Sequence, residues 1–348
     1  MNSKQSIIVE LLSHQELSKF QEFIRKFWKK DHLFVEETSV FDWQHKESYT
    51  YNCMKAKKGG SLVGVQTFIP QNHFDHNLSD DQIFLTLWAV TESQGIGVGL
   101  RLFKKIISEF KPRFIGVVGI NDRLIPFHKW QGFKVGIMNH SVALSPYHNS
   151  FKVAKVPLNY KIKGGIIDKE ITYKKITIED LKRSETDDIF SYQWPTKSVN
   201  YVINRYLKHP TYSYDIFALY KNENLLALFV LRPISKYDRT VLRIIDYYGS
   251  NETISSSYVF IKDVLKKYNA EYLDMYSFGV SLDALEDAGL MRIQNGKELI
   301  IPNYFEPFLR ENINIAYAYK AEHHPHPPIR LFKGDGDQDR PSQINGEN

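Results

Sequence analysis

The 348-residue sequence has a single cysteine, Cys53, and no run of 18 apolar residues. One cysteine cannot close a disulfide within the chain, which favours a reducing compartment. The apolar stretch near the N-terminus is too short for a signal peptide, and no stretch is long enough to span a membrane. We therefore expect a cytoplasmic protein with no membrane partner, in which Cys53 is a packed thiol and not a nucleophile.

The chain also lacks a strong charge of either sign. Its 45 basic and 40 acidic residues leave a net charge of +5, spread along the sequence. So mild a charge argues against nucleic-acid binding, whereas it suits a small polyanionic ligand such as a nucleotide.

Metal-binding motifs are incomplete. Asp335, Asp337 and Asp339 match the first three positions of a calcium loop, but Arg340 stands where that loop requires glycine. Three nearby histidines lack a second ligand pair at zinc spacing (His323, His324, His326). We expect no metal, and a polar terminal loop in this region.

The composition is that of a folded protein long enough for two domains, with 43% apolar and 24% charged residues. Residues 49–71 read as a strand hairpin, and the continuous apolar segment 82–90 as a buried strand. A glycine-rich stretch and a helix to about residue 110 follow. Further alternating elements are a strand at 113–121, a helix around 123–133 and a strand at 134–144. This order predicts a mixed α/β fold.

The same order of patterns begins again near residue 161. Tyr49 and Tyr51 recur as Tyr212 and Tyr214, an offset of 163 residues. The offset then becomes 157, which matches the strand 113–121 to residues 270–278. A longer insert at residues 71–81 of the first half explains the change. We predict two copies of one fold, as domains 1–160 and 161–348.

Three glycines follow the buried strand 82–90 at every second position: Gly95, Gly97 and Gly99. Glycine inside a helix costs about 0.5–1 kcal/mol, so the bare backbone must serve a purpose. The first amides of a helix have no internal partners and attract anions. A strand, a glycine turn and a helix N-terminus together predict a site for a phosphate or diphosphate.

The segment Gln94–Gly99, directly after Leu87–Val90, resembles the acyl-CoA loop of the GNAT superfamily of N-acyltransferases. That family has the pattern Gln/Arg-x-x-Gly-x-Gly/Ala. Downstream, "PFHKWQGF" resembles the family's closing helix, and Asn121 ends the intervening strand. The resemblance implies the mixed α+β sheet of a GNAT domain, with acyl-CoA as co-substrate.

The resemblance also implies which residues hold CoA. The loop amides would bind the pyrophosphate, the end of the buried strand would pair with pantetheine, and Asn121 would meet the end of that arm. The expected CoA-binding residues are Ala89, Val90, Gln94, Gly95, Ile96, Gly97, Val98, Gly99, Leu100 and Asn121. In the second half the three glycines become Glu252, Ile254 and Ser256, so we expect a degenerate copy and one CoA per chain.

Three residues are candidates for proton transfer. Many GNAT enzymes place a tyrosine four residues before the closing Gly-Phe to protonate the leaving thiolate, and His128 stands there. In the insert, His73 is a candidate base, and Glu92 could act through a water molecule. For each, a structural role is the alternative.

The tandem arrangement, with "RYLKHPTYSY" and "KGDGDQDRP", resembles the bacterial two-domain nucleotide-sugar N-acyltransferases of the FdhC type. This implies acylation of a dTDP-linked amino sugar, such as a 3-amino-3,6-dideoxyhexose, by an acetyl or 3-hydroxybutanoyl donor for surface polysaccharide such as O-antigen. The expected acceptor-binding residues are Trp43, His45, Trp88, Tyr206 and Arg232. A peptidoglycan-type aminoacyl transferase and a non-catalytic CoA-binding protein remain alternatives, and a homodimer stays open.

Overall fold

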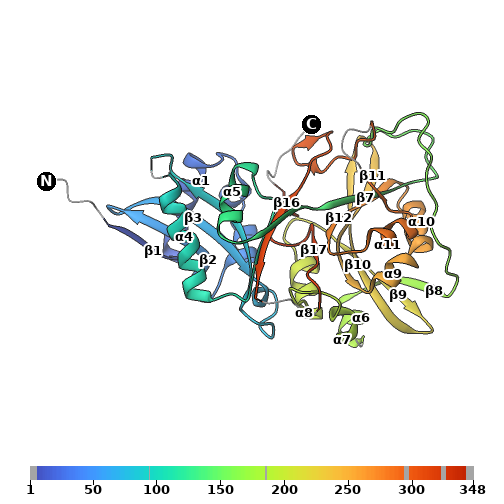
Figure 1. The fold of residues 1–348 in the computed structure, drawn as a ribbon, viewed down its shortest axis with the longest axis horizontal. Coiled ribbons are helices and arrows are strands. Elements are labelled where there is room, and N and C mark those ends of the chain that lie inside the picture. Colours follow the sequence, from blue (N-terminus) through green and yellow to red (C-terminus); the bar gives the residue numbers. More distant parts are fainter. Residues whose placement is uncertain (1–5, 94, 185, 294–297, 323–326, 342–348) are drawn as a thin grey trace.

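The computed structural model describes residues 6–341 apart from 94, 185, 294–297 and 323–326. Two large mixed sheets lie side by side (Figure 1). In the first sheet the order is β1-β2-β3-β4-β5-β16-β6. Its strands are Ile7–Ser13 (β1), Thr50–Lys58 (β2), Ser61–Pro70 (β3), Gln82–Val90 (β4), Phe114–Val118 (β5), Lys134–Ile137 (β6) and Ala316–Ala321 (β16).

The second sheet has the order β13-β7-β12-β11-β10-β9-β8, and β17 pairs with β12 beside this path. Its strands are Asn139–Leu144 (β7), Ile171–Ile176 (β8), Asp215–Lys221 (β9), Asn224–Lys236 (β10), Arg239–Gly249 (β11), Ala270–Phe278 (β12), Met291–Arg292 (β13) and Leu331–Phe332 (β17). A separate small hairpin joins Tyr304–Phe305 (β14) and Phe308–Leu309 (β15).

The two halves of the chain exchange one strand. β7 from the first half lies between β12 and β13, and β16 from the second half lies between β5 and β6. Figure 1 shows β16, in red, beside the blue and teal strands, while β7, in green, crosses toward the orange ones. The segment 134–144, expected as one strand, is therefore two strands in two sheets. The domain boundary at residue 160 stays a prediction, because each half of the chain contributes one strand to the sheet of the other half.

The strand order repeats between the sheets, as the sequence predicts. β4 and β11 begin 157 residues apart, as do α5 (Ile125–Trp130) and α11 (Leu282–Asp287), and β3 and β10 begin 163 residues apart. The insert at 71–81 separates β3 from β4, whereas β10 and β11 are joined by a turn at Tyr237 and Asp238.

Helices cover both faces of the first sheet. On one face, α4 (Gly95–Phe110) packs against β1 to β4. On the other, α1 (Leu17–Phe27), α2 (Leu33–Glu36) and α3 (Thr38–His45) bury a cluster that includes Cys53. Cys53 has no exposed surface, and burial raises the pKa of its thiol, so it is the packed thiol predicted above.

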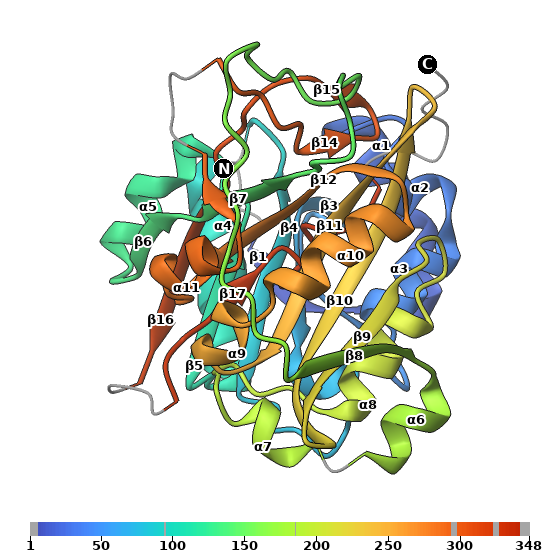
Figure 2. The same ribbon diagram turned by 90° about the vertical axis from the view of Figure 1, so that its right-hand side faces the viewer.

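In the second half, α10 (Tyr258–Lys267) lies across the sheet (Figure 2). The short helix Asn251–Ser255 (α9) packs in the same core as α10, whereas Ile178–Arg183 (α6), Asp187–Phe190 (α7) and Val199–Val202 (α8) pack on the opposite face of the sheet. Among the described residues, no helix is both long and apolar enough to cross a bilayer.

Candidate active site

The strands β4 and β5 diverge toward their C-terminal ends. They pair as parallel neighbours only from Gln82 to Phe84, opposite Phe114 to Gly116. On its other edge β4 stays paired with β3 as far as Val90. A bulge bends β4, because Gln66 of β3 lies opposite Trp88 while Phe68 lies opposite Leu85, so β4 has one residue more over this interval. The sheet therefore opens into a wedge after Phe84.

A cavity of about 390 Å³ occupies this wedge. Its walls combine the diverging strands, the helix α5 and three segments from the second half of the chain, around Tyr304, at 314–316 and at 337–340. The residues that matter below are Trp88, Asn121, His128, Tyr304, Asp337 and Arg340. Of the residues predicted for CoA or acceptor binding, the structure thus brings Trp88 and Asn121 together with the candidate acid His128.

The glycines after β4 have different neighbours. A Cβ at Gly97 would meet no atom within 4 Å, so this backbone faces open space. A Cβ at Gly99 would lie 2.5 Å from Cζ2 of Trp88, so Gly99 lets the helix α4 pack against the indole ring. Gly97 therefore fits the predicted role of admitting a ligand to bare backbone, whereas Gly99 serves the packing of α4. Gln94 lies outside the described residues, and Gly95 begins α4.

Backbone groups on one edge of β4 are available for a ligand. Beyond Phe84, β4 pairs with β3 alone among the strands that the structure describes. The other edge of Leu85–Val90, which faces the wedge, therefore has no partner strand in that part of the chain. Successive residues of a strand direct their backbone groups to opposite edges, and the Thr91 amide donates to the Val63 carbonyl of β3, so Val90 faces the wedge while the backbone groups of Ala89 face β3. An extended ligand with amide groups can bind such an edge as an added strand.

His128 lies on α5 and is 2% exposed. Its Nδ1 is 2.9 Å from the Leu124 carbonyl oxygen, which can only accept, so Nδ1 carries the proton. Burial lowers the pKa of His128, and the hydrogen bond to Leu124 only partly opposes this. The neutral ring keeps an acceptor lone pair on Nε2. In this state Nε2 can take up a proton, and it can act as an acid only after it has done so.

The other proton-transfer candidates do not line the cavity. His73 is held by Glu47, 2.7 Å from Nδ1, and by the Trp43 carbonyl, 2.9 Å from Nε2. Both ring nitrogens are thus engaged within the protein. Glu92 is exposed just beyond β4. Neither residue is among those that form the walls.

Two predicted acceptor residues of the first half are packed elsewhere. His45 is fully buried, with Nδ1 3.1 Å from the Phe68 carbonyl, and burial keeps its pKa well below the ordinary value. Trp43 donates from Nε1 to the Asn204 carbonyl and carries Arg205 over its ring at 5.0 Å. Both residues contribute to packing, and Trp43 joins the two halves.

Tyr206 and Arg232, predicted to bind the acceptor, are also buried. Tyr206 donates to Asp246 at 2.7 Å, and Arg232 forms an ion pair with Asp339 at 3.0 Å. Neither lines the wedge cavity. Their partners belong to a buried polar network described below.

Several wall residues were not predicted from the sequence. They are Trp28, Tyr304, Asn314, Asp337, Gln338 and Arg340. The last three lie within the segment expected as a polar terminal loop. Instead, residues 329–336 and Asp339 are buried, and the aspartates of the incomplete calcium motif pair with cations of the chain. Only the resemblance in "KGDGDQDRP" hinted that this region has a function.

Comparison with known proteins gives the fold. No family model and no curated protein matches the chain. Among solved structures, an Enterococcus faecalis protein described as a probable N-acyltransferase is 11% identical and covers 89% of this chain and 72% of its own, with a TM-score of 0.55. A GCN5-related N-acetyltransferase from Anabaena variabilis is 9% identical over 90% of this chain and 72% of its own, with a TM-score of 0.54.

A third neighbour is the GCN5-related glucosamine N-acetyltransferase region of a fungal multi-domain enzyme, 13% identical over 92% of this chain and 38% of that chain, with a TM-score of 0.50. At such identities the likeness shows the fold alone. The chain has the mixed α/β fold of the GCN5-related N-acetyltransferases, which confirms the predicted fold class.

Proposed function

We propose that this chain, folded as a GCN5-related N-acetyltransferase, is an acyl-CoA-dependent N-acyltransferase. The observation that carries the proposal is the wedge between β4 and β5, which opens beside the glycine-rich start of α4 and holds a cavity with His128 in its wall. Fold likeness alone would not support an activity, because one fold hosts many functions.

The residues around the wedge fit acyl-CoA. The start of α4 offers unpaired amides, and Gly97 leaves the open space that a diphosphate needs. The free edge of β4, which includes the backbone groups of Val90, suits an amide of pantetheine. Asn121 lines the cavity, although its Oδ1 already accepts a hydrogen bond from the Arg123 amide. When bound, acyl-CoA supplies an activated thioester.

Within the cavity, His128 is suited to proton transfer. Nε2 accepts a proton from the amine as the new N–C bond forms, and returns it to the sulfur as the C–S bond breaks, so the proton balance closes without a metal or a second cofactor. Holding amine and thioester together can contribute about 7–11 kcal/mol, so a modest base suffices.

For the acceptor we propose a dTDP-linked amino sugar, such as a 3-amino-3,6-dideoxyhexose, acylated from an acetyl or 3-hydroxybutanoyl donor. The resemblance of both halves to bacterial sugar N-acyltransferases supports this class, as does the mildly positive net charge of +5. The polar wall opposite β4, with Tyr304, Asn314 and Arg340, suits a hydroxylated substrate.

The test is a panel assay with acyl-CoAs and amines that include dTDP-amino sugars. Thiol release should accompany a product whose mass increases by one acyl group. Acylation of other amines alone would contradict the acceptor class. No thiol release with any amine would contradict the enzyme activity.

A further inference from the structure

The second half has its own wedge, and the chain fills it. β11 and β12 pair as parallel strands from Thr240 to Ile244 and then part. Residues 329–341, here called the C-terminal strap, enter between them: Phe332 pairs with Ser277 of β12, and the Gly334 amide donates to the Ile245 carbonyl of β11 at 2.9 Å. The strap thus bridges both strands where the first half leaves a cavity.

The strap explains why the second wedge should bind no CoA. The side chains that stand in place of the three glycines explain it less well. Ile254, expected to obstruct a diphosphate, is 1% exposed and packs into the hydrophobic core. Glu252 is exposed. The backbone of the strap itself occupies the edges of β11 and β12 that a ligand would need.

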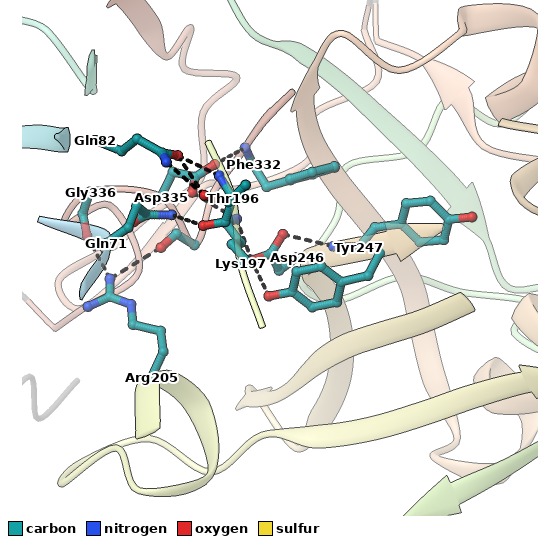
Figure 3. A network of polar contacts seen from close by, with 12 residues as sticks. Gln71, Gln82, Thr196, Lys197, Arg205, Asp246, Tyr247, Phe332, Asp335 and Gly336 are labelled. Atoms are coloured by element: carbon teal, nitrogen blue, oxygen red, sulfur yellow. Dashed lines mark hydrogen bonds and ion pairs between the residues drawn. The ribbon is translucent and has the colours of Figure 1, made fainter. Parts of the chain in front are cut away.

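Buried charges fix the strap in this wedge (Figure 3). Lys197 lies between Asp246 of β11 at 2.7 Å and Asp335 of the strap at 2.9 Å. Asp335 also accepts from the Phe332 amide at 2.7 Å, and Arg205 donates to the Gly336 carbonyl at 2.6 Å. Breaking a buried ion pair from one side is strongly destabilising, so this end of the strap is held in one place.

The same network reaches the first half. Thr196, next to Lys197, donates from its amide and hydroxyl to Oε1 of Gln82 at 2.6 and 2.9 Å. Gln82 is the first residue of β4, which forms one wall of the active-site cavity. The strap is therefore positioned relative to β4 through Asp335, Lys197 and Thr196 (Figure 3).

The other end of the strap forms a wall of that cavity. Asp337, Gln338 and Arg340 line it, and Asp339 between them is anchored by Arg232 at 3.0 Å and Tyr214 at 2.6 Å. Gly119, at the end of β5, has φ +83°, and a Cβ there would lie 1.9 Å from Gln338. Gly119 thus allows the strap to approach β5 closely.

Asp337 is the only carboxylate among the described residues that line the cavity. Arg340 donates to its Oδ2 from Nε at 3.2 Å and from an Nη at 3.0 Å. Oδ1 has no hydrogen-bond partner in the described part of the chain. A fixed carboxylate oxygen of this kind can accept hydrogen bonds from an amine or ammonium group.

We propose that the C-terminal strap is the acceptor-recognition wall of the active site, with Asp337 accepting a hydrogen bond from the amine that becomes acylated. The inference rests on the proposed N-acyltransferase function. On this proposal the second half of the chain has a role in acceptor binding, because its wedge holds the strap in position in place of a ligand.

Asp337→Asn tests the contact directly. Its KM for the dTDP-linked 3-amino-3,6-dideoxyhexose should rise about tenfold or more, since a charged hydrogen bond is lost, while the dissociation constant for CoA stays within twofold. Asp238→Asn, in the exposed β10–β11 turn, is the matched control and should leave both values unchanged. An unchanged acceptor KM in Asp337→Asn, with an active wild type, would overturn this inference alone.

Asp335→Asn tests the anchoring. This variant keeps the ion pair of Lys197 with Asp246 but removes the ion pair that joins Lys197 to the strap. We expect faster amide hydrogen exchange at Gly334, a raised acceptor KM and unchanged CoA affinity. Faster exchange with an unchanged KM would contradict the positioning role. A wild type that transfers no acyl group to any amine would overturn the proposed function, and this inference with it.

Discussion

His128 is the residue on which the proposed chemistry depends most. Since burial lowers its pKa below the usual 6.5, the ring is neutral at pH 7 and becomes protonated only in more acidic solution. A base must be unprotonated to act. We predict that kcat falls with decreasing pH, with a midpoint below 6.5.

Substitution supplies the matching test of this residue. His128→Gln should lower kcat by about 100-fold or more and remove the acidic limb, because general base catalysis contributes about 10²–10⁴-fold. His148→Gln, at an exposed histidine, is the control. A kcat that instead falls as the pH rises through this range would assign His128 the role of acid.

Lys333 of the strap is fully buried and has a pKa of about 7, chiefly because of desolvation, with Arg243 adding to the effect. The folded state therefore holds this amine neutral between pH 7 and the ordinary value of 10.5, while the unfolded chain keeps it protonated. The unfolded state binds more protons in this window, so stability rises with pH there.

The contribution of Lys333 to the free energy of unfolding should rise by up to about 1.4 kcal/mol per pH unit above pH 7. Urea unfolding at pH 7, 8 and 9 measures it. Lys333→Met should flatten this dependence, whereas Lys320→Met, at an exposed site, should retain it. Equal slopes in all three proteins would mean that Lys333 stays protonated in the fold.

Residue roles were the least predictable part of the site. His45 was predicted to bind the acceptor and His73 to act as a base, yet contacts with Phe68, Glu47 and Trp43 bury or engage them. Sequence spacing carries no information about such contacts. Trp88 and Asn121 were predictable because they lie near the C-terminal ends of neighbouring strands, and His128 because it lies in a known helix pattern.

At the scale of elements, the start of α4 is the predicted anion site. Gly97→Glu would place a carboxylate in the open space where the diphosphate is expected, so CoA binding should fall below detection by calorimetry. Ser108→Glu, at the exposed far end of the same helix, adds the same charge and should retain binding. Equal affinities of the two variants would contradict the location of the site.

Most elements were predictable because each has a strong local pattern. The apolar run 82–90 corresponds to β4 (Gln82–Val90), and the hairpin pattern 49–71 corresponds to β2 and β3. The exchange of β7 and β16 between the two sheets was not predictable, because residues 134–144 form one continuous strand pattern in the sequence. Which sheet a strand joins depends on partners more than a hundred residues away.

At the scale of the whole molecule, the two halves differ at their corresponding wedges. The first wedge is open and lined by groups suited to acyl transfer, whereas the second is closed by the strap. The exchanged strands and the Lys197 network join the copies through long-range contacts. The burial of the C-terminal strap could not be predicted from its own polar sequence. Its aspartates can be buried only because cations from distant parts of the chain pair with them.

The stoichiometry of CoA binding tests the central claim most directly. Calorimetric titration of CoA into the full chain should give one site per chain, because the first wedge can take the pantetheine arm and the strap fills the second. Two equivalent sites would contradict the closed second wedge, and no binding would contradict the acyl-CoA site itself.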